Sequence, residues 1–230
     1  MLHTKRVVCL LASLFLVLVT LPVWGADKAS DEETIRNAAT VLQAMLSSND
    51  VSRSVLGKAD CIIILPSVKK FAVGIGGTGG RGPMSCREGK GFTGKWSPPA
   101  MYSIGGASAG FQIGGKAVVY VIAIMAPTAV DKVLSSKVKV GTDVSAAAGP
   151  GASAPSNSTA DMLTYSRSSG LFAGVSLDGA SLSPDSDANQ RLYGKPASAK
   201  EIVSGSGVTA TTAGQSLVAL LDSKAGKHVQ

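Results

Sequence analysis

Histidine is almost absent from the 230-residue chain, which contains only His3 and His228. The commonest metal ligand, which is also a frequent general base of enzymes, is therefore nearly missing. The acidic residues form no cluster that would supply oxygen ligands instead. The sequence predicts no metal site and no cofactor, and it argues against catalysis that depends on histidine.

Aromatic and charged residues are also scarce, at 5% and 16% of the chain. The chain has no arginine-rich run, and few aromatic side chains lie near its positive charges. Proteins that bind single-stranded nucleic acid combine such charges with aromatic rings on which the bases stack. The formal net charge of +7 favours anionic partners in general, but the composition argues against nucleic acid.

One long apolar run is present, and it lies near the N-terminus. VVCLLASLFLVLV follows the cationic start MLHTKR and precedes TLPVWGA, which is the layout of a secretory signal peptide. The run is too short to span a bilayer, which needs about 20 residues. We predict a signal peptide over residues 1–26, cleaved after Gly25 or Ala26, with a retained signal anchor as the alternative. The mature protein is then exported, either periplasmic or secreted, and can lie peripherally on a membrane.

Removal of this leader changes the charge and the cysteine content. Without Lys5 and Arg6, the cationic residues fall from 22 to 20 against 15 acidic ones, which leaves a net charge of +5. The cysteines that remain are Cys61 and Cys86, and an exported pair of this kind predicts a disulfide. Two buried free thiols are the alternative. A metal site at these cysteines is disfavoured because no histidine lies near either of them.

Helices are expected at both ends of the chain and once between them. Ser30 and Glu33 form a capping-box pattern, and apolar residues then recur at helical spacing as far as about Ser47. Residues 223–230 are expected to form a flexible tail. Further helices are predicted over residues 51–56, 128–135, 187–194 and 212–221, with a second capping box at 198–201.

The segments between these helices have the features of β-strands. CIIILP is a short apolar run closed by Pro66, typical of a buried strand, and AVVYVIAIMA is too short for a membrane span. Lys137 and Lys139 alternate with valines, as in a strand with one charged face. Glycines interrupt many of these segments and permit sharp bends. We predict an α+β fold in a single domain over residues 27–222, with a bent or closed, barrel-like antiparallel sheet flanked by N-terminal, central and C-terminal helices.

AVGIGGTGGRG, from Ala72 to Gly82, contains the G-x-G-x-x-G pattern of dinucleotide-binding turns. That site requires a helix directly behind the glycines and an acidic residue about 20 positions further on. Neither is present, and Pro83 and further glycines follow instead. The glycines therefore belong to the sheet, and no nucleotide partner is predicted.

Gly106–Gly110 matches G-x-S-x-G, the nucleophile elbow of hydrolases, with Ser108 at its centre. The elbow needs a helix after the serine and a histidine as base. Strand-like sequence follows instead, and His228 stands third from the end. We therefore predict that the protein is not an enzyme, and a serine hydrolase that uses Ser108 is the least favoured alternative.

Lysine and arginine residues within or beside the strand segments are the candidate binding residues. Together they can neutralise the phosphates of an anionic membrane surface, whereas each one alone fits an ordinary solvated position. The first group flanks one predicted hairpin and is expected to share a face. The candidates are Lys69, Lys70, Arg81 and Arg87 in that group, Lys137 and Lys139 as a second set, and Arg167.

Four segments occur in a characteristic order: ILPSVKK before GIGG, WSPPAMYSIGG before GFQIGG, VGTDVSAAAGPGA, and YSRSSGLFAGVSLDGASLSPDSDANQRLYG. Together they closely resemble the SYLF (Ysc84-type) lipid-binding domain family, from about Ala59 to Val203. The resemblance implies a compact α+β fold, no enzymatic activity, and binding of phosphoinositides or other anionic lipids. Some eukaryotic members bind and bundle actin, which does not suit an exported chain. The expected partner is therefore an anionic membrane lipid, bound either by docking on its surface or through an acyl chain in an apolar cavity within the sheet. An envelope structural or protein-interaction domain without a lipid role is the alternative.

The sequence departs from the family pattern at three positions. Ser169 stands where arginine is common, Ala109 where an aromatic residue is common, and Pro98 where alanine is common. The missing arginine weakens the case for Arg167 as a phosphate anchor of the family type. The resemblance therefore transfers no lipid site residue by residue.

Overall fold

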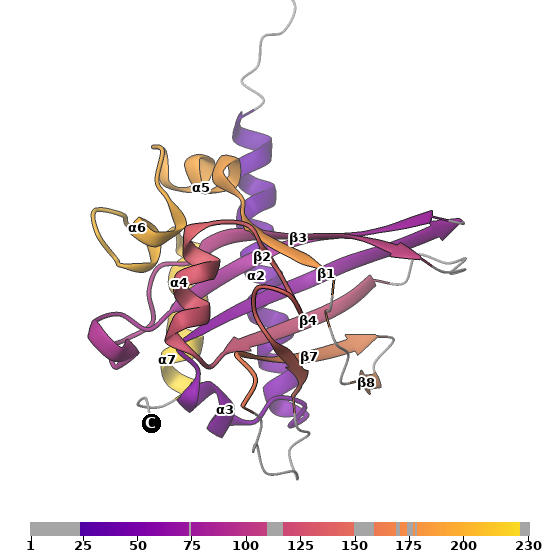
Figure 1. The fold of residues 1–230 in the computed structure, drawn as a ribbon. Helices are drawn as coiled ribbons and strands as arrows, with labels where there is room; N and C mark the ends of the chain where they lie inside the picture. Colours follow the sequence, from indigo (N-terminus) through magenta and orange to yellow (C-terminus); the bar gives the residue numbers. More distant parts are fainter. Residues whose placement is uncertain are drawn as a thin grey trace, which may run out of the picture.

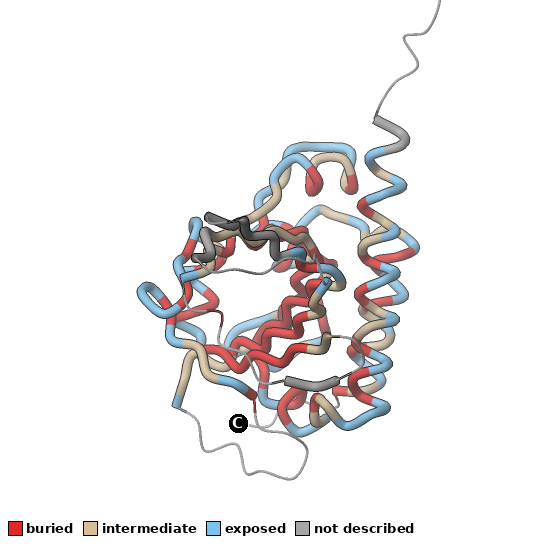
Figure 2. The backbone as a smooth tube through the Cα atoms, turned by 90° about the vertical axis from the view of Figure 1, so that its right-hand side faces the viewer, coloured by how far each residue is buried: buried red, intermediate tan, exposed pale blue. Residues whose placement is uncertain are grey.

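A computed structural model of the chain describes residues 24–73, 75–109, 117–149, 159–168, 171–173, 177 and 179–225. One curled sheet forms a half-barrel, and helices pack on both of its faces (Figure 1, Figure 2). The α+β fold predicted from the sequence is confirmed. The leader predicted over residues 1–26 lies almost entirely outside the described residues, so it stays a prediction.

The strands of the described residues are hydrogen-bonded in the order β5-β9-β3-β2-β1-β4-β7-β6, and β8 pairs with β7. Their pairs are antiparallel, as predicted, except for β6 and β7, which run parallel. The bounds are Cys61–Val73 for β1, Ile75–Cys86 for β2, Ala100–Ala109 for β3, Ala117–Ile124 for β4, Val138–Lys139 for β5, Ala146–Ala148 for β6, Met162–Ser168 for β7, Leu171–Ala173 for β8 and Ser181–Pro184 for β9.

The helices divide between the two faces of the sheet. Residues of α2, α3, α5 and α7 share one buried core with the sheet, and residues of α4 and α6 share the other. The last helix continues to Ala225, so residues 223–225 are helical and not part of a tail. The bounds are Trp24–Ser47 for α2, Arg53–Lys58 for α3, Lys90–Phe92 for the short 3-10 turn η1, Pro127–Ser135 for α4, Ser186–Tyr193 for α5, Ala199–Val203 for α6 and Thr212–Ala225 for α7.

The apolar run that predicted a buried strand forms the first half of β1. Side chains alternate between the two faces along a strand. Cys61, Ile63 and Leu65 therefore enter the core shared with α4 and α6. Ile62 and Ile64 enter the core shared with α2, α3 and α7. All five side chains are buried, so β1 belongs to both cores.

The sequence predicted that this strand ends at Pro66. The structure shows that β1 continues beyond the proline, to Val73. The pairing register of β1 shifts against both β2 and β4 around this proline. Proline has no N–H to donate to the ladder, and an irregularity of this kind accommodates it within a central strand. Gly82 lies on the neighbouring β2, where a Cβ atom would overlap the carbonyl oxygen of Ile64. Close approach of the two backbones therefore requires glycine at that position.

Cys61 and Cys86 form a disulfide between β1 and β2, as predicted. The two residues are direct partners in the strand register, and their Cα atoms lie 3.9 Å apart. Both residues are buried. The bridge therefore joins the first residue of β1 to the last residue of β2, at the end of the pair remote from its turn.

The two predicted capping boxes have different outcomes. α2 begins at Trp24, so the interpretation of Ser30 as an N-cap is wrong. The preceding residues continue the same helix, and the Ser30 carbonyl accepts a hydrogen bond from Thr34 Oγ1 at 3.0 Å. The second box is confirmed, because Ser198 N donates to Glu201 Oε2 at 2.8 Å and Glu201 N donates to Ser198 Oγ at 3.2 Å.

Candidate functional site

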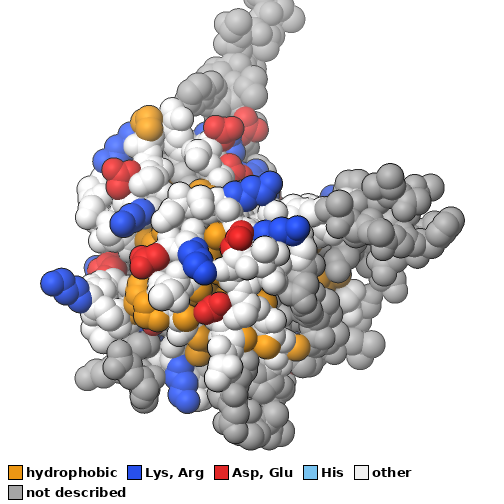
Figure 3. Space-filling view, in the orientation of Figure 1, with side chains coloured by type: hydrophobic (Ala, Val, Ile, Leu, Met, Phe, Trp, Pro, Cys, Tyr) orange, Lys and Arg blue, Asp and Glu red, His pale blue; other side chains and the backbone are white. Residues whose placement is uncertain are grey.

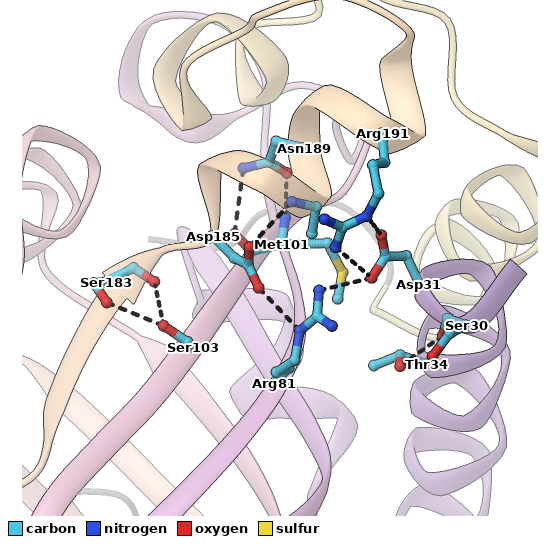
Figure 4. Close-up of polar contacts among 11 residues, drawn as sticks. Ser30, Asp31, Thr34, Arg81, Met101, Ser103, Ser183, Asp185, Asn189 and Arg191 are labelled. Atoms are coloured by element: carbon cyan, nitrogen blue, oxygen red, sulfur yellow. Dashed lines mark hydrogen bonds and ion pairs between the residues drawn. The ribbon is translucent and has the colours of Figure 1, made fainter. Parts of the chain in front are cut away.

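A buried carboxylate joins three elements at one side of the sheet. Asp31 of α2 is fully buried, and its oxygens accept hydrogen bonds from two arginines (Figure 4). Arg81 Nη2 of β2 donates to Oδ1 at 2.6 Å, and Arg191 Nε of α5 donates to Oδ2 at 2.8 Å. A buried charge is tolerated when it is paired and hydrogen-bonded in this way. These contacts hold α2 to both β2 and α5.

Asp185 completes the ionic network beside Arg81. Its Oδ2 lies 2.9 Å from Arg81 Nε in an ion pair, and its Oδ1 accepts a hydrogen bond from Ala188 N as the N-cap of α5. The hydrogen bond from Arg191 to Asp31 raises the pKa of the arginine above its usual value. Two arginines and two aspartates thus compensate one another, and their charges serve the fold.

A second polar contact fixes α5 on the sheet. The buried Asn189 of α5 accepts a hydrogen bond from Met101 N at 2.7 Å and donates one to Met101 O at 3.3 Å (Figure 4). Both backbone groups of one β3 residue are therefore satisfied by a single amide. The helix that supplies Asp185 and Arg191 is held in place independently of the ion pairs.

A groove of about 480 Å³ with a mixed polar and apolar lining lies beside this network, between α2 and the β1–β2 pair. In the strand register Ser67 is paired with Arg81, and Lys69 with Gly79. Residues two apart on a strand point to the same face, so these four positions share the sheet face next to α2. The wall on the helix side includes the polar Thr34, Asn37 and Thr40, and the apolar Val41 and Pro66 also line the groove.

The cations predicted to share a face on the β1–β2 pair have different positions. Lys69 and Arg81 do come together, at this groove. Lys69 is exposed, whereas Arg81 is half-buried and bound to two aspartates. Lys70 is paired with Thr78 through the backbone, and its side chain lies outside the described part of the structure.

Arg87 does not reach the surface that the sequence predicted for it. The residue is only 3% exposed, and its guanidinium stacks over the Trp96 ring at 4.7 Å from the ring centre. Burial lowers the pKa of Arg87, and the nearby carboxylates of Asp222 and Asp60 oppose that shift. The stem of a long side chain and a flat guanidinium pack well against an indole, which keeps this arginine inside.

Arg167 is also engaged within the protein. Its Nη1 lies 3.5 Å from Asp50 Oδ2, and its side chain is 31% exposed. The pair joins β7 to the turn that follows α2. The charge of Arg167 is therefore partly compensated, and the arginine contributes less than a free lysine to attraction of an anionic surface.

Lys137 and Lys139 are both exposed, and the valine between them is buried, as their alternation predicted. They lie at β5, the edge of the sheet. Lys132 of α4 lies close by, because its Nζ donates a hydrogen bond to Asp143 O at 2.7 Å and Asp143 Oδ2 accepts one from Lys139 N at 2.6 Å. A shallow hollow of about 730 Å³ opens here, lined by both Lys132 and Lys137. On the face of the molecule that carries α4, basic and acidic side chains are interspersed (Figure 3).

Asp31, Asp185 and Arg191 are the site residues that sequence reasoning missed. A signal for Asp31 was present, because it precedes Ile35 by four residues and so falls on the buried stripe of α2. A carboxylate on such a stripe indicates a buried partner. The sequence carries no comparable signal for the partner itself, since Arg191 lies in a distant helix.

Ser108 lies within β3 and is paired with Gly76, so it does not stand at a strand-to-helix turn. Its side chain and both histidines fall outside the described residues. Within the described ranges, no cluster of three or more histidine, cysteine or acidic residues is arranged to hold a metal ion. Within the same ranges, no helix combines the length and the apolar character that crossing a membrane requires.

The curled sheet, its two cores and the ionic network define a helix-covered half-barrel module. The family model described as "Ysc84: Las17-binding protein actin regulator" matches residues 105–224, more than half of the chain. The chain belongs to this family, whose domain is also called SYLF, and the resemblance drawn from the sequence is confirmed.

Known proteins from fungi and animals are similar to the chain. SH3 domain-containing protein PJ696.02 of Schizosaccharomyces pombe is 37% identical over 139 residues, which cover 57% of this chain and 32% of that protein. Protein YSC84 of Saccharomyces cerevisiae is 30% identical over 205 residues, which cover 83% of this chain and 43% of that protein. The human SH3 domain-containing YSC84-like protein 1 is 34% identical over 157 residues, which cover 66% of this chain and 45% of that protein. The chain thus spans less than half the length of each of these relatives.

Proposed function

We propose that the protein is a non-catalytic module that docks on anionic phospholipid surfaces outside the cytoplasm. The observation that carries the proposal is the exposure of Lys137 and Lys139 at the sheet edge, with Lys132 beside them. Each lysine near an anionic membrane contributes about 1 kcal/mol. Membership of the SYLF family is consistent with this role.

The charges around these lysines predict the character of the docking. Asp131 and Asp143 also line the hollow, so the local positive charge is small. Three lysines alone would supply roughly 3 kcal/mol, and repulsion by the two aspartates reduces this, so the attraction offsets only part of the cost of association. Docking is therefore weak, reversible and sensitive to salt, because exposed charges are screened within about 8 Å at physiological ionic strength.

The export and the absence of catalysis in this proposal rest on separate observations. A disulfide between Cys61 and Cys86 suits an oxidising compartment, and the sequence begins with the pattern of a signal peptide. Ser108 lies within a strand, whereas the hydrolase nucleophile stands at a sharp turn into a helix. Both observations support the proposal from the chain itself.

Co-sedimentation with liposomes tests the proposed docking. We expect binding to vesicles that contain phosphatidylglycerol, little binding to pure phosphatidylcholine, and loss of binding at high salt. The double variant Lys137→Glu/Lys139→Glu should weaken binding at least about tenfold, because two attractive charges become repulsive. The control Lys58→Glu/Lys200→Glu makes the same change in charge on exposed positions of α3 and α6. Equal loss in both variants, or equal binding to both kinds of vesicle, would count against docking at β5.

A protein partner is the second candidate, and the relatives favour it. The family description names Las17 binding and actin regulation, which are properties of those relatives. In an exported protein the partner would be a component of the cell envelope, since actin is not met there. We expect no co-sedimentation with actin filaments. No binding to either kind of vesicle would make the envelope-interaction role the better reading.

A further inference from the structure

We infer that the groove between α2 and the β1–β2 pair binds a phosphorylated polyol, such as the headgroup of a glycerophospholipid or a soluble sugar phosphate. The inference deepens the proposed function, on which it rests for the lipid source of the ligand. It concerns a different face from β5, since the groove is formed by α2, β1 and β2. The two proposals can therefore fail separately.

The helix wall of the groove offers groups that recognise hydroxyls. Thr34, Asn37 and Thr40 follow one another at intervals of three, so they lie along one side of α2. The Thr34 and Thr40 hydroxyls each donate to a helix carbonyl, at 3.0 and 3.1 Å, which leaves their oxygens as acceptors. The Asn37 amide both donates and accepts. A polyol presents several hydroxyls that match these groups.

The opposite wall offers positive charge for a phosphate. Lys69 is exposed and lines the groove. Arg81 uses Nη2 for Asp31 and Nε for Asp185, and Nη1 has no bond to any other group that the structure describes. The Arg81 side chain is 38% exposed, so this edge of the guanidinium can reach a ligand. Phosphate accepts strong charge-assisted hydrogen bonds from both types of side chain.

The aspartates fix the arginine without blocking the groove. Asp31 is fully buried beneath it, and α5 positions Asp185. A guanidinium anchored in this way loses little side-chain freedom when a ligand binds. Because both aspartates already compensate charge on this side, the net attraction comes mainly from Lys69. A singly phosphorylated ligand therefore fits better than a highly charged one.

The floor of the groove is open because Gly79 has no side chain. A Cβ atom placed there would meet nothing within 4 Å, and the backbone of Gly79 is not in the left-handed region. Residue 79 can therefore carry a larger side chain that fills the groove without disturbing the strand. The volume of about 480 Å³ falls within the usual range of small-molecule sites.

The test titrates the protein with inositol 1-phosphate, glycerol 3-phosphate and inorganic phosphate, and follows binding by calorimetry. We expect saturable binding of at least one polyol phosphate, tighter than that of inorganic phosphate. Gly79→Val should weaken it at least about tenfold by occupying the groove. Gly105→Val is the matched control, since Gly105 is the β3 partner of Gly79 and its Cβ would make only an ordinary contact at 3.8 Å.

A second pair of variants tests the role of positive charge in the groove. Lys69→Gln should weaken binding by roughly tenfold, the effect of one charge-assisted hydrogen bond. Lys58→Gln should leave it unchanged, because this exposed lysine of α3 lines neither the groove nor the hollow at β5. Far-ultraviolet circular dichroism and thermal unfolding of each variant separate loss of binding from loss of the fold.

Vesicles that contain phosphatidylglycerol distinguish the source of the ligand. If Gly79→Val weakens binding to these vesicles, the ligand of the groove is a lipid headgroup. If soluble polyol phosphates bind but Gly79→Val does not change vesicle binding, the ligand is a free phosphate. If no polyol phosphate binds and vesicle binding is the same in Gly79→Val as in the unmodified protein, the inference is overturned. Vesicle binding that is then still lost in Lys137→Glu/Lys139→Glu leaves the proposed function standing.

Discussion

Asp31 and Arg191 are 160 positions apart in the sequence, yet two hydrogen bonds of 2.8 and 3.2 Å join their side chains. Asp31 belongs to α2 and Arg191 to α5. Arg81 joins the same carboxylate from the sheet. One side chain therefore holds together the N-terminal helix, a central strand and a helix from the last quarter of the chain.

Removal of the charge at Asp31 should destabilise the protein strongly. Asp31→Asn leaves two arginines without their shared carboxylate, and breaking a buried ion pair costs about 3 kcal/mol or more. Thermal unfolding measures the effect. Glu32→Gln is the control, because Glu32 forms only a surface pair with Arg36 at 3.5 Å and should change stability by less than about 0.5 kcal/mol. Equal melting temperatures for Asp31→Asn and the unmodified protein would show that the network does not stabilise the fold.

The disulfide should be intact in protein isolated from its own compartment, and its loss should lower stability. The cysteines are 25 positions apart, and closing a loop of this size stabilises by roughly 3 kcal/mol in the chain-entropy model. Cys61→Ala/Cys86→Ala should therefore unfold at a lower denaturant concentration. Intact mass with and without reductant tests the bond itself. Two free thiols in such protein would contradict it.

Arg87 should affect stability and not docking. Arg87→Met keeps the side-chain stem but removes the cation over Trp96, for a loss of about 1–2 kcal/mol. Vesicle binding, measured below the unfolding transition, should not change, because the guanidinium is buried. A variant that remained fully stable but no longer bound vesicles would return Arg87 to the candidate lipid-binding residues.

Two buried tyrosines, Tyr102 and Tyr165, and the partly buried Tyr193 should make the protein sensitive to high pH. Burial raises the pKa of Tyr165 to about 12, and it also raises the pKa values of Tyr102 and Tyr193. An unfolded tyrosine ionises near pH 10. The folded state thus favours the neutral phenol, so the stability linked to these groups is present below pH 10 and is lost as the pH rises towards 12. Chemical denaturation at a series of pH values measures the loss, and Tyr165→Phe should reduce it.

Local features of the fold were predictable because neighbouring residues determine them. The apolar run of β1, the capping box at Ser198 and the alternation of Lys137 and Lys139 all act over a few residues. The cysteine pairing was also predicted, since removal of the predicted leader with Cys9 would leave two cysteines with a single intramolecular choice. The prediction of an N-cap at Ser30 was wrong, because a short capping pattern also occurs inside a continuous helix.

The candidate site was only partly predictable, because its partners are far apart in the sequence. Arg81 meets Asp31 across 50 positions, and no local pattern distinguishes a paired arginine from a free one. Arg87 was expected at the surface, but the ring of Trp96 lies over its guanidinium. The exposure of Lys69, Lys137 and Lys139 was predicted correctly, because a lysine is rarely buried without a partner. The sequence therefore identified cations near the groove but not which of them carry free charge.

The position of β1 between two layers of apolar side chains has a consequence for how the protein unfolds. Neither layer can open without exposing side chains of the strand that also supports the other. The two cores should therefore melt as one cooperative unit. Amide hydrogens at Ile62, Ile63 and Ile64 should exchange with solvent only through global unfolding and should be among the slowest in the chain. The helices on the two faces would then report the same transition.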